Sequence, residues 1–201
     1  ATAGRYDPAA EVFVVDEDDS LTIDAGDPTE SAALEPSPNG ARVNLGSYGN
    51  TAEASKSGRY AGCVTARIVG AGQTYTNITD AVAALPTTLT GHTCVVIADG
   101  AVYTEQVTVE GFTNDGSSIT IFADPASGLR PIIDPPLGST AAFHIVNSSI
   151  NIYGIGVQAT SLIEYGVYAS SDYVRVSSVV VDAGAAPYDN IWLAGVALSS
   201  W

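Results

Sequence analysis

Apolar and polar residues alternate with a period of two over most of the chain after Cys63. Such alternation is typical of strands with one buried face, and it predicts strands at residues 95–97, 106–109, 119–122, 143–146, 150–157, 174–181 and 191–198. Residues 78–85 follow a helical spacing instead, with Asn77 suited to the N-cap, Asp80 three residues later and Pro86 as a stop. The pattern therefore predicts an all-β fold with one short helix.

Part of the chain repeats itself. The stretches "INIYGIGV" from Ile150 and "VRVSSVVV" from Val174 keep four apolar positions in step at one constant offset. The stretches IVNSS, VYASS and VALSS share an ending, at Ser149, Ser171 and Ser200. A coil that stacks Ile and Val on the coil below keeps such a register, whereas an antiparallel sandwich has no reason to. We expect a parallel β-helix, right-handed by the rule for parallel crossovers, with Ser-Ser pairs at one corner.

The stretch 1–58 has a different character. Residues 1–50 hold ten acidic side chains against Arg5 and Arg42, and only residues 12–15 and 21–23 have the pattern of strands. Turn-forming residues separate these short strands. The sequence therefore predicts a loop-rich acidic segment over 1–58, followed by a β-helix domain over 59–201.

Composition excludes some classes of partner. The formal net charge of −15 argues against nucleic acid, since phosphate binding needs clustered Lys and Arg. No apolar run approaches the ~20 residues of a membrane span. A basic-then-apolar signal peptide is also absent, so a secreted form would be a processed or internal segment.

A family resemblance rests on the sequence after residue 74. The stretches YTNITDAVAALP, CVVIADGAVYTEQVTVEGF and SITIFADPASGLRPIID resemble the opening of pectin-lyase-like β-helix domains, and distantly the opening of pectin esterases. The resemblance implies that the short helix caps the N-terminal end of the coil. It also implies that the segment with Tyr103 and Glu105 forms the first coils.

The acidic segment resembles something else. Its IDAGDP and PNGARVNLGSYGNT resemble the closing stretch of β-helix domains in large bacterial surface proteins, which implies a secreted or cell-surface location. A closing motif thus precedes an opening motif, and the last coil is left uncovered. Two explanations stay open: further repeats of a longer chain, or head-to-tail pairing with other copies. In either, Val196, Leu198 and Trp201 would contact the next coil.

The chemistry of the resembling enzymes is not found in the sequence. Pectin esterases need two catalytic Asp on later coils, a Gln-lined oxyanion site and an Arg, and their stretches for these are absent here. Asp134, Asp182, Arg130 and Arg175 qualify by residue type only. We therefore predict no catalytic residue and a structural or adhesive module, with structural roles for Tyr103 and Glu105.

Two other functions remain as alternatives. One is a carbohydrate-active enzyme, like a pectin esterase or lyase, that acts on an acidic polysaccharide. The other is a glycan-binding module that uses exposed tyrosines as stacking platforms. The candidates for that role are Tyr153, Tyr165, Tyr168 and Tyr173.

A structural Ca²⁺ site and a disulfide complete the expectations. Ca²⁺ takes 6–8 oxygen ligands, and six carboxylates lie within twelve residues: Asp16, Glu17, Asp18, Asp19, Asp24 and Asp27. A solvated acidic loop is the alternative. Cys63 and Cys94 lack metal-ligand spacing. They form either a disulfide, as an extracellular protein allows, or two separately buried thiols.

Overall fold

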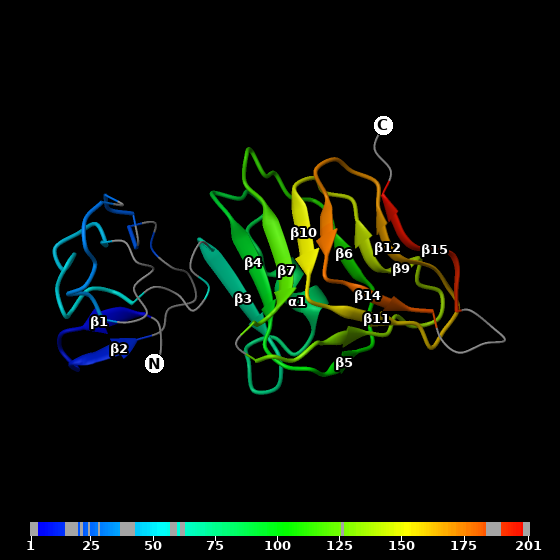
Figure 1. Ribbon diagram of the computed structural model, residues 1–201, viewed down its shortest axis with the longest axis horizontal. Coiled ribbons are helices and arrows are strands. Elements are labelled where there is room, and N and C mark those ends of the chain that lie inside the picture. Colours follow the sequence, from blue (N-terminus) through cyan, green and yellow to red (C-terminus); the bar gives the residue numbers. More distant parts are fainter. Residues whose placement is uncertain are drawn as a thin grey trace. The chain divides into compact units, whose positions relative to one another are not determined.

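The computed structural model is nearly all β, with a single short helix among the residues that it describes (Figure 1). These residues are 4–14, 20, 22–23, 25–27, 29–36, 43–56, 60, 63–125, 127–183 and 190–198. The chain divides into two units, Ala1–Ala66 and Arg67–Trp201. Strand β3, Thr65–Val69, crosses this division.

In the described part of the first unit, β1 (Arg5–Asp7) and β2 (Val12–Val14) form a small antiparallel sheet. Elsewhere in this unit turns are held by side chains. The carboxylate of Glu35 accepts hydrogen bonds from the backbone N–H groups of Asn44 at 2.8 Å and Asn50 at 2.7 Å. The strand predicted at 21–23 is wrong where it is described, because Thr22 and Ile23 form a turn.

The second unit is a β-solenoid of about four coils, built from three sheets. The strand orders are β13-β10-β7-β4-β3, β14-β11-β8-β5 and β15-β12-β9-β6, which we call the first, second and third sheets. Neighbouring strands from β4 to β15 pair in parallel. The strands after β3 are β4 (Thr93–Ile97), β5 (Val102–Tyr103), β6 (Val107–Val109), β7 (Ile119–Ala123), β8 (Ile132–Ile133), β9 (Ala141–Ile145), β10 (Ile150–Tyr153), β11 (Gly156–Gln158), β12 (Ile163–Ala169), β13 (Arg175–Ser177), β14 (Val180–Asp182) and β15 (Ile191–Leu198).

Apolar side chains stack in columns inside the solenoid. In the third sheet one column runs from Val107 through Phe143 and Val167 to Val196, each residue paired with the next. The first three of these side chains are fully buried. Because stacked coils share one interior, each apolar side chain is covered by its counterparts above and below. The predicted columns of Ile and Val are therefore confirmed.

The helix α1, Ile78–Ala83, begins as its sequence predicts. The side chain of Asn77 accepts a hydrogen bond from the N–H of Asp80 at 2.7 Å, which satisfies one of the free donors of the first turn. Ile78 and Val82 are buried in the main apolar core, and the helix lies against β4 and β6. Its apolar face thus belongs to the solenoid interior.

The constant offset between the two repeated stretches is confirmed, whereas two finer predictions were wrong. Ile152 pairs with Val176 and Val157 with Val181, as the offset from Ile150 to Val174 requires.

The first error concerns the length of the strands, because 150–157 and 174–181 are not single strands but bend between two sheets. The second concerns the Ser-Ser endings. The alignment of VYASS with VALSS is confirmed, because Val167 pairs with Val196, but the alignment of IVNSS with VYASS would pair Ile145 with Val167. Ile145 pairs with Ala169 instead, at the same spacing as Ile152 and Val176. A shift of two positions keeps the same face of a strand, so the sequence pattern did not reveal the error.

The corners between sheets repeat with the same period. Ser149 and Tyr173 occupy equivalent positions in successive coils, and both have φ of 59°. Gly154 and Ser178, which are also equivalent, have φ of 75° and 51°. These are left-handed conformations, which cost a bulky L residue about 1–2 kcal/mol. The side chain of Tyr173 is 84% exposed, so little burial offsets the cost of its left-handed backbone.

Replacement of Tyr173 by asparagine, which tolerates the left-handed region, is therefore expected to stabilise the protein by about 0.5–1 kcal/mol. The measurement is urea denaturation followed by circular dichroism. Leu137→Asn is the matched control, because Leu137 is also exposed, at 78%, but is not among the residues with positive φ. Equal effects of the two changes would contradict the strain argument.

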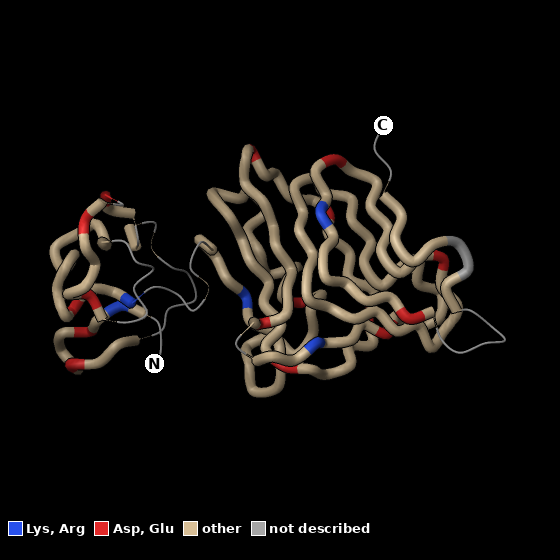
Figure 2. Tube along the Cα trace, in the orientation of Figure 1, with Lys and Arg blue, Asp and Glu red and all other residues tan. Residues whose placement is uncertain are grey.

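Charged residues are sparse along the trace and mostly acidic (Figure 2). The formal net charge is −15, from 22 Asp and Glu residues against 7 Lys and Arg residues. No helix in the described part of the chain has the length and apolar character needed to cross a membrane. The exclusion of nucleic acid stays a prediction from charge.

Candidate functional site

Glu105, one of the two residues that the esterase resemblance singles out, is bound to the start of α1. Its carboxylate accepts hydrogen bonds from the N–H groups of Ile78 and Thr79, both at 2.8 Å, and from the Thr79 hydroxyl. The first N–H groups of a helix have no partners within the helix, and a negative charge there is favourable. Glu105 thus joins the loop after β5 to α1 and caps the helix.

Tyr103, the second of these residues, takes part in a separate contact. Its hydroxyl donates to the carboxylate of Asp99 at 2.7 Å, and Asp99 also accepts from the N–H of Ala71 at 2.8 Å. Burial opposes ionisation of Asp99, but the hydrogen bonds from Ala71, Tyr103 and Ala101 lower the pKa of its carboxyl group. Burial and the hydrogen bond to Asp99 raise the pKa of Tyr103. This phenol is therefore a fixed donor at neutral pH.

Loss of the Glu105 charge is expected to destabilise the fold. In Glu105→Gln the amide keeps one acceptor oxygen and turns an NH₂ group toward backbone donors, which should cost about 1–2 kcal/mol. Thermal and urea denaturation measure the change. Glu110→Gln is the control, because Glu110 is exposed and makes no side-chain hydrogen bond among the described residues. Equal stability of the two variants would rule out the capping role.

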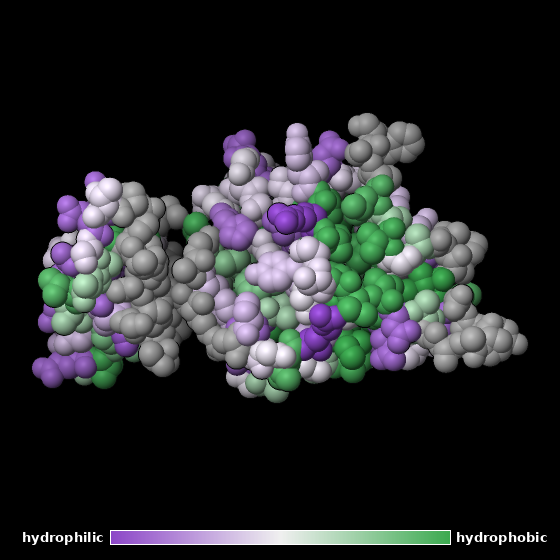
Figure 3. All heavy atoms as spheres, viewed as in Figure 1, coloured by the Kyte–Doolittle hydropathy of each residue, from purple (hydrophilic) through white to green (hydrophobic). Residues whose placement is uncertain are grey.

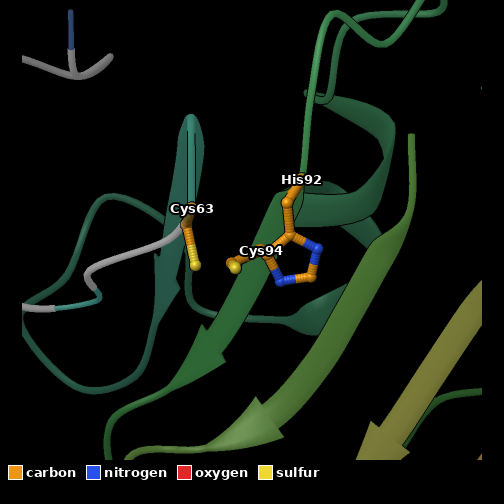
Figure 4. Close-up of side chains that lie close together, drawn as sticks. All are labelled: Cys63, His92 and Cys94. Atoms are coloured by element: carbon orange, nitrogen blue, oxygen red, sulfur yellow. The ribbon is translucent and has the colours of Figure 1, made fainter. Parts of the chain in front are cut away.

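Cys63 and Cys94 are joined in a disulfide, which confirms the first of the two predicted alternatives. Cys63 lies just before β3, and Cys94 is a fully buried residue of β4. The His92 side chain lies beside them (Figure 4), and the sulfurs and a ring nitrogen are within 4.8 Å of one another. Both sulfurs are used by the disulfide, so the group as it stands offers no thiolate to a metal.

His92 is held by hydroxyl groups. Its Nδ1 lies 2.7 Å from the Ser118 hydroxyl and its Nε2 3.4 Å from the Thr120 hydroxyl. Partial burial lowers the pKa of His92, so the ring is neutral at neutral pH. Each ring nitrogen of His92 thus has a hydroxyl partner, and these contacts account for His92 as a structural residue.

The predicted Ca²⁺ ligands cannot be assembled into a site. Asp16, Glu17, Asp18, Asp19 and Asp24 lie outside the described residues. The sixth carboxylate, that of Asp27, accepts hydrogen bonds from the N–H of Thr29 at 2.8 Å and its hydroxyl at 2.7 Å. This is a local turn contact that any Asp can make. The Ca²⁺ site stays a prediction.

The other chemical candidates are dispersed. The Asp134 carboxylate accepts hydrogen bonds from the N–H and hydroxyl of Thr160. Tyr153 stacks on Phe122, with ring centroids 4.8 Å apart. Tyr165 and Tyr168 stack on each other at the same distance. The tyrosines suggested as glycan platforms therefore form two separate stacks, with Tyr173 at a corner.

The predicted assembly residues lie in the last strand. Val196 and Leu198 of β15 are 44% and 56% exposed, and Trp201 lies outside the described residues. Val196 pairs with Val167, which is fully buried in the preceding coil. The apolar column thus continues into a coil that leaves it exposed.

A hollow of about 440 Å³, which the sequence analysis missed, follows the corner between the third and first sheets. Three successive coils line it, through Phe112 and Asn114, residues 146–148, and residues 170–172. The only signal in the sequence was the repeated Ser-Ser pair, which marks this corner in two of the coils. The sequence pattern placed the Ser-Ser pairs at a corner but did not show that Phe112, Asn114 and Asn147 lie beside them, because the coils differ in length.

Comparison with known proteins identifies no relative. No family model matches the chain, no curated protein matches it significantly, and no solved structure does so either. The resemblances to pectin-lyase-like domains and to bacterial surface proteins therefore stay hypotheses. Function has to be argued from the residues themselves.

Proposed function

We propose that this chain is a non-catalytic structural and adhesive module that assembles end to end through the exposed face of its last coil. The observation that carries the proposal is the pair Val196 and Leu198. Both continue interior columns, yet they are 44% and 56% exposed, whereas Val167 and Ala169 below them are fully buried. A coil of another copy, placed on this face, would bury them and continue the columns.

The edge of the last coil supports the same conclusion. Strands β13, β14 and β15 each end the order of their sheet, so each has one side without a paired strand in the described structure. Unpaired edges offer backbone donors and acceptors to another chain. Val180 of β14 is 51% exposed, and hydrophobic side chains gather over this part of the molecule (Figure 3).

The first unit supplies a counterpart to that face. Among its described residues, Val12, Leu34, Leu45 and Tyr48 are large apolar side chains that are 49–68% exposed. Large exposed apolar groups favour contact with another surface. We propose that this unit of one copy covers the last coil of the next, as the closing motif in residues 1–58 suggests. A heterologous contact of this kind gives an open fibre or tandem array.

The finer features of the fold belong to the same proposal. We propose a right-handed solenoid, from the rule for parallel crossovers, with α1 as the cap of its first coil. Contacts of α1 with β4 and β6 and its burial in the core support the cap. The disulfide supports a secreted or cell-surface location, because disulfides persist in oxidising compartments.

We propose that the chain has no catalytic activity, because the residues that could be taken for catalytic ones make structural contacts. Tyr103 and Glu105 hold Asp99 and α1, and Asp134 binds Thr160. Each is engaged in a contact that stabilises the coil. Incubation with polygalacturonate and methylated pectin, followed by reducing-end and methanol assays, tests this directly. Turnover by the wild type that Asp134→Asn or Glu105→Gln abolishes would overturn the proposal.

The assembly is tested by Leu198→Asp. A buried, unpaired carboxylate in the contact should weaken self-association by about tenfold or more. Sedimentation velocity over a concentration series and negative-stain electron microscopy are the measurements. We expect concentration-dependent, elongated assemblies of the wild type and mainly single subunits of Leu198→Asp.

Leu137→Asp is the matched control for the assembly test. Leu137 is 78% exposed, lies between β8 and β9, and belongs to no column. This variant should assemble like the wild type. A wild type that sediments as one subunit at all concentrations, or equal assembly of Leu198→Asp, would refute the proposal.

A further inference from the structure

We infer that the corner hollow is a binding site for a neutral, polyhydroxylated ligand, the chemistry presented by an uncharged oligosaccharide. Its volume, about 440 Å³, lies within the range of small-molecule sites. It extends over three coils, each of which adds about 4.8 Å along the solenoid. None of its lining residues belongs to β13, β14 or β15, so the site uses none of the strands that form the proposed assembly face.

The frame of the hollow is already fixed by hydrogen bonds between coils. Asn147 accepts from the N–H of Phe112 at 2.9 Å and donates to its carbonyl at 2.6 Å. Asn114 donates to the carbonyl of Ser148 at 2.6 Å, and the Ser171 hydroxyl donates to the carbonyl of Asn147 at 2.7 Å. A ligand therefore meets a preorganised surface, which lowers the entropic cost of binding.

Three polar groups remain available to a ligand. The carboxylate of Asp172 is exposed, and it has no hydrogen-bond partner among the described residues. The Ser170 hydroxyl likewise makes no side-chain hydrogen bond there. The Ser148 hydroxyl has only a long contact of 3.4 Å with Asn114. Together they offer one strong acceptor and two hydroxyls that donate or accept, which suits a ligand with many hydroxyl groups.

Apolar groups adjoin these polar ones. Val146 is 42% exposed, and Phe112 is partly buried against the core. The C–H groups of a sugar ring can pack on such atoms while its hydroxyls reach Asp172 and the serines. Specific sites commonly combine an apolar surface with a few placed polar groups.

The charge of the hollow argues against acidic saccharides and Ca²⁺ ions as its ligands. None of its lining residues is Lys or Arg, and Asp172 is its only carboxylate. An acidic saccharide would be repelled by Asp172 and by the net charge of −15. A Ca²⁺ ion needs more oxygen ligands than one carboxylate supplies, and the side-chain oxygen of Asn147 is already bound to Phe112.

The test uses the whole chain labelled with ¹⁵N and amide chemical-shift mapping. The probes are cellotriose, maltotriose and N,N′,N″-triacetylchitotriose as neutral trisaccharides, and trigalacturonate as the acidic one, each titrated to about 20 mM. We expect at least one neutral probe to shift amides at 111–114, 146–149 and 170–173. Asp172→Asn should weaken that binding about tenfold, because a charge-assisted hydrogen bond is lost.

Glu164→Gln is the control, since it removes a carboxylate at the other end of β12 and should bind like the wild type. Ser170→Ala, which keeps the charge, should weaken binding severalfold. The inference is overturned if no neutral probe shifts these amides, if Asp172→Asn binds as well as the wild type, or if trigalacturonate binds more tightly than every neutral probe. The free spectrum of each variant shows that it is folded.

Discussion

Replacement of Phe143 by alanine is expected to lower the free energy of unfolding by about 3–5 kcal/mol. Phe143 is fully buried in the column between Val107 and Val167. The three stacked coils cannot fill the cavity that the lost ring leaves without moving their strands. The lost free energy of burying the ring and the cost of the cavity therefore add. Urea denaturation followed by circular dichroism measures the loss.

The neighbouring residue is the control for that prediction. His144 lies on the outer side of the same strand, with its ring 5.6 Å from that of Tyr168. His144→Ala should change stability by less than about 1 kcal/mol. If the two substitutions have similar effects, the column is not the source of stability. A cooperative transition in both variants is required for the comparison.

Removal of the disulfide is expected to cost about 3–4 kcal/mol, because the link between Cys63 and Cys94 closes a loop of about 30 residues in the unfolded chain. The double variant Cys63→Ala/Cys94→Ala tests this, with urea denaturation under oxidising conditions as the measurement. The wild type treated with a phosphine reductant should show a similar loss.

The matching control is the effect of the reductant on the double variant. Its stability should not change, since no disulfide is left to reduce. The disulfide does not form if the wild type is only as stable as the double variant and its mass does not rise by two hydrogens on reduction. A formed disulfide without a stability gain would instead contradict the loop-closure argument.

The sequence alone determined the features that depend on neighbouring residues or on a strict period. Asn77 and Asp80 predicted the start of α1, because capping is settled within one turn. The constant offset that links Ile152 to Val176 predicted the parallel stacking, because every coil must bury the same positions. The strand 191–198 was predicted with the same bounds that the structure has.

Only the tertiary structure decided which distant residues meet. The carboxylate of Glu105 accepts a hydrogen bond from the first residue of α1, Ile78, which lies much earlier in the chain. No sequence spacing predicts this contact. The hollow at the corner needs Phe112, Asn147 and Asp172 from three coils. The coils differ in length, from 24 residues between Phe143 and Val167 to 36 between Val107 and Phe143, so a single sequence offset does not predict which corner residues meet. Local sequence encodes propensity and period, whereas contacts between coils depend on how all the corners align in space.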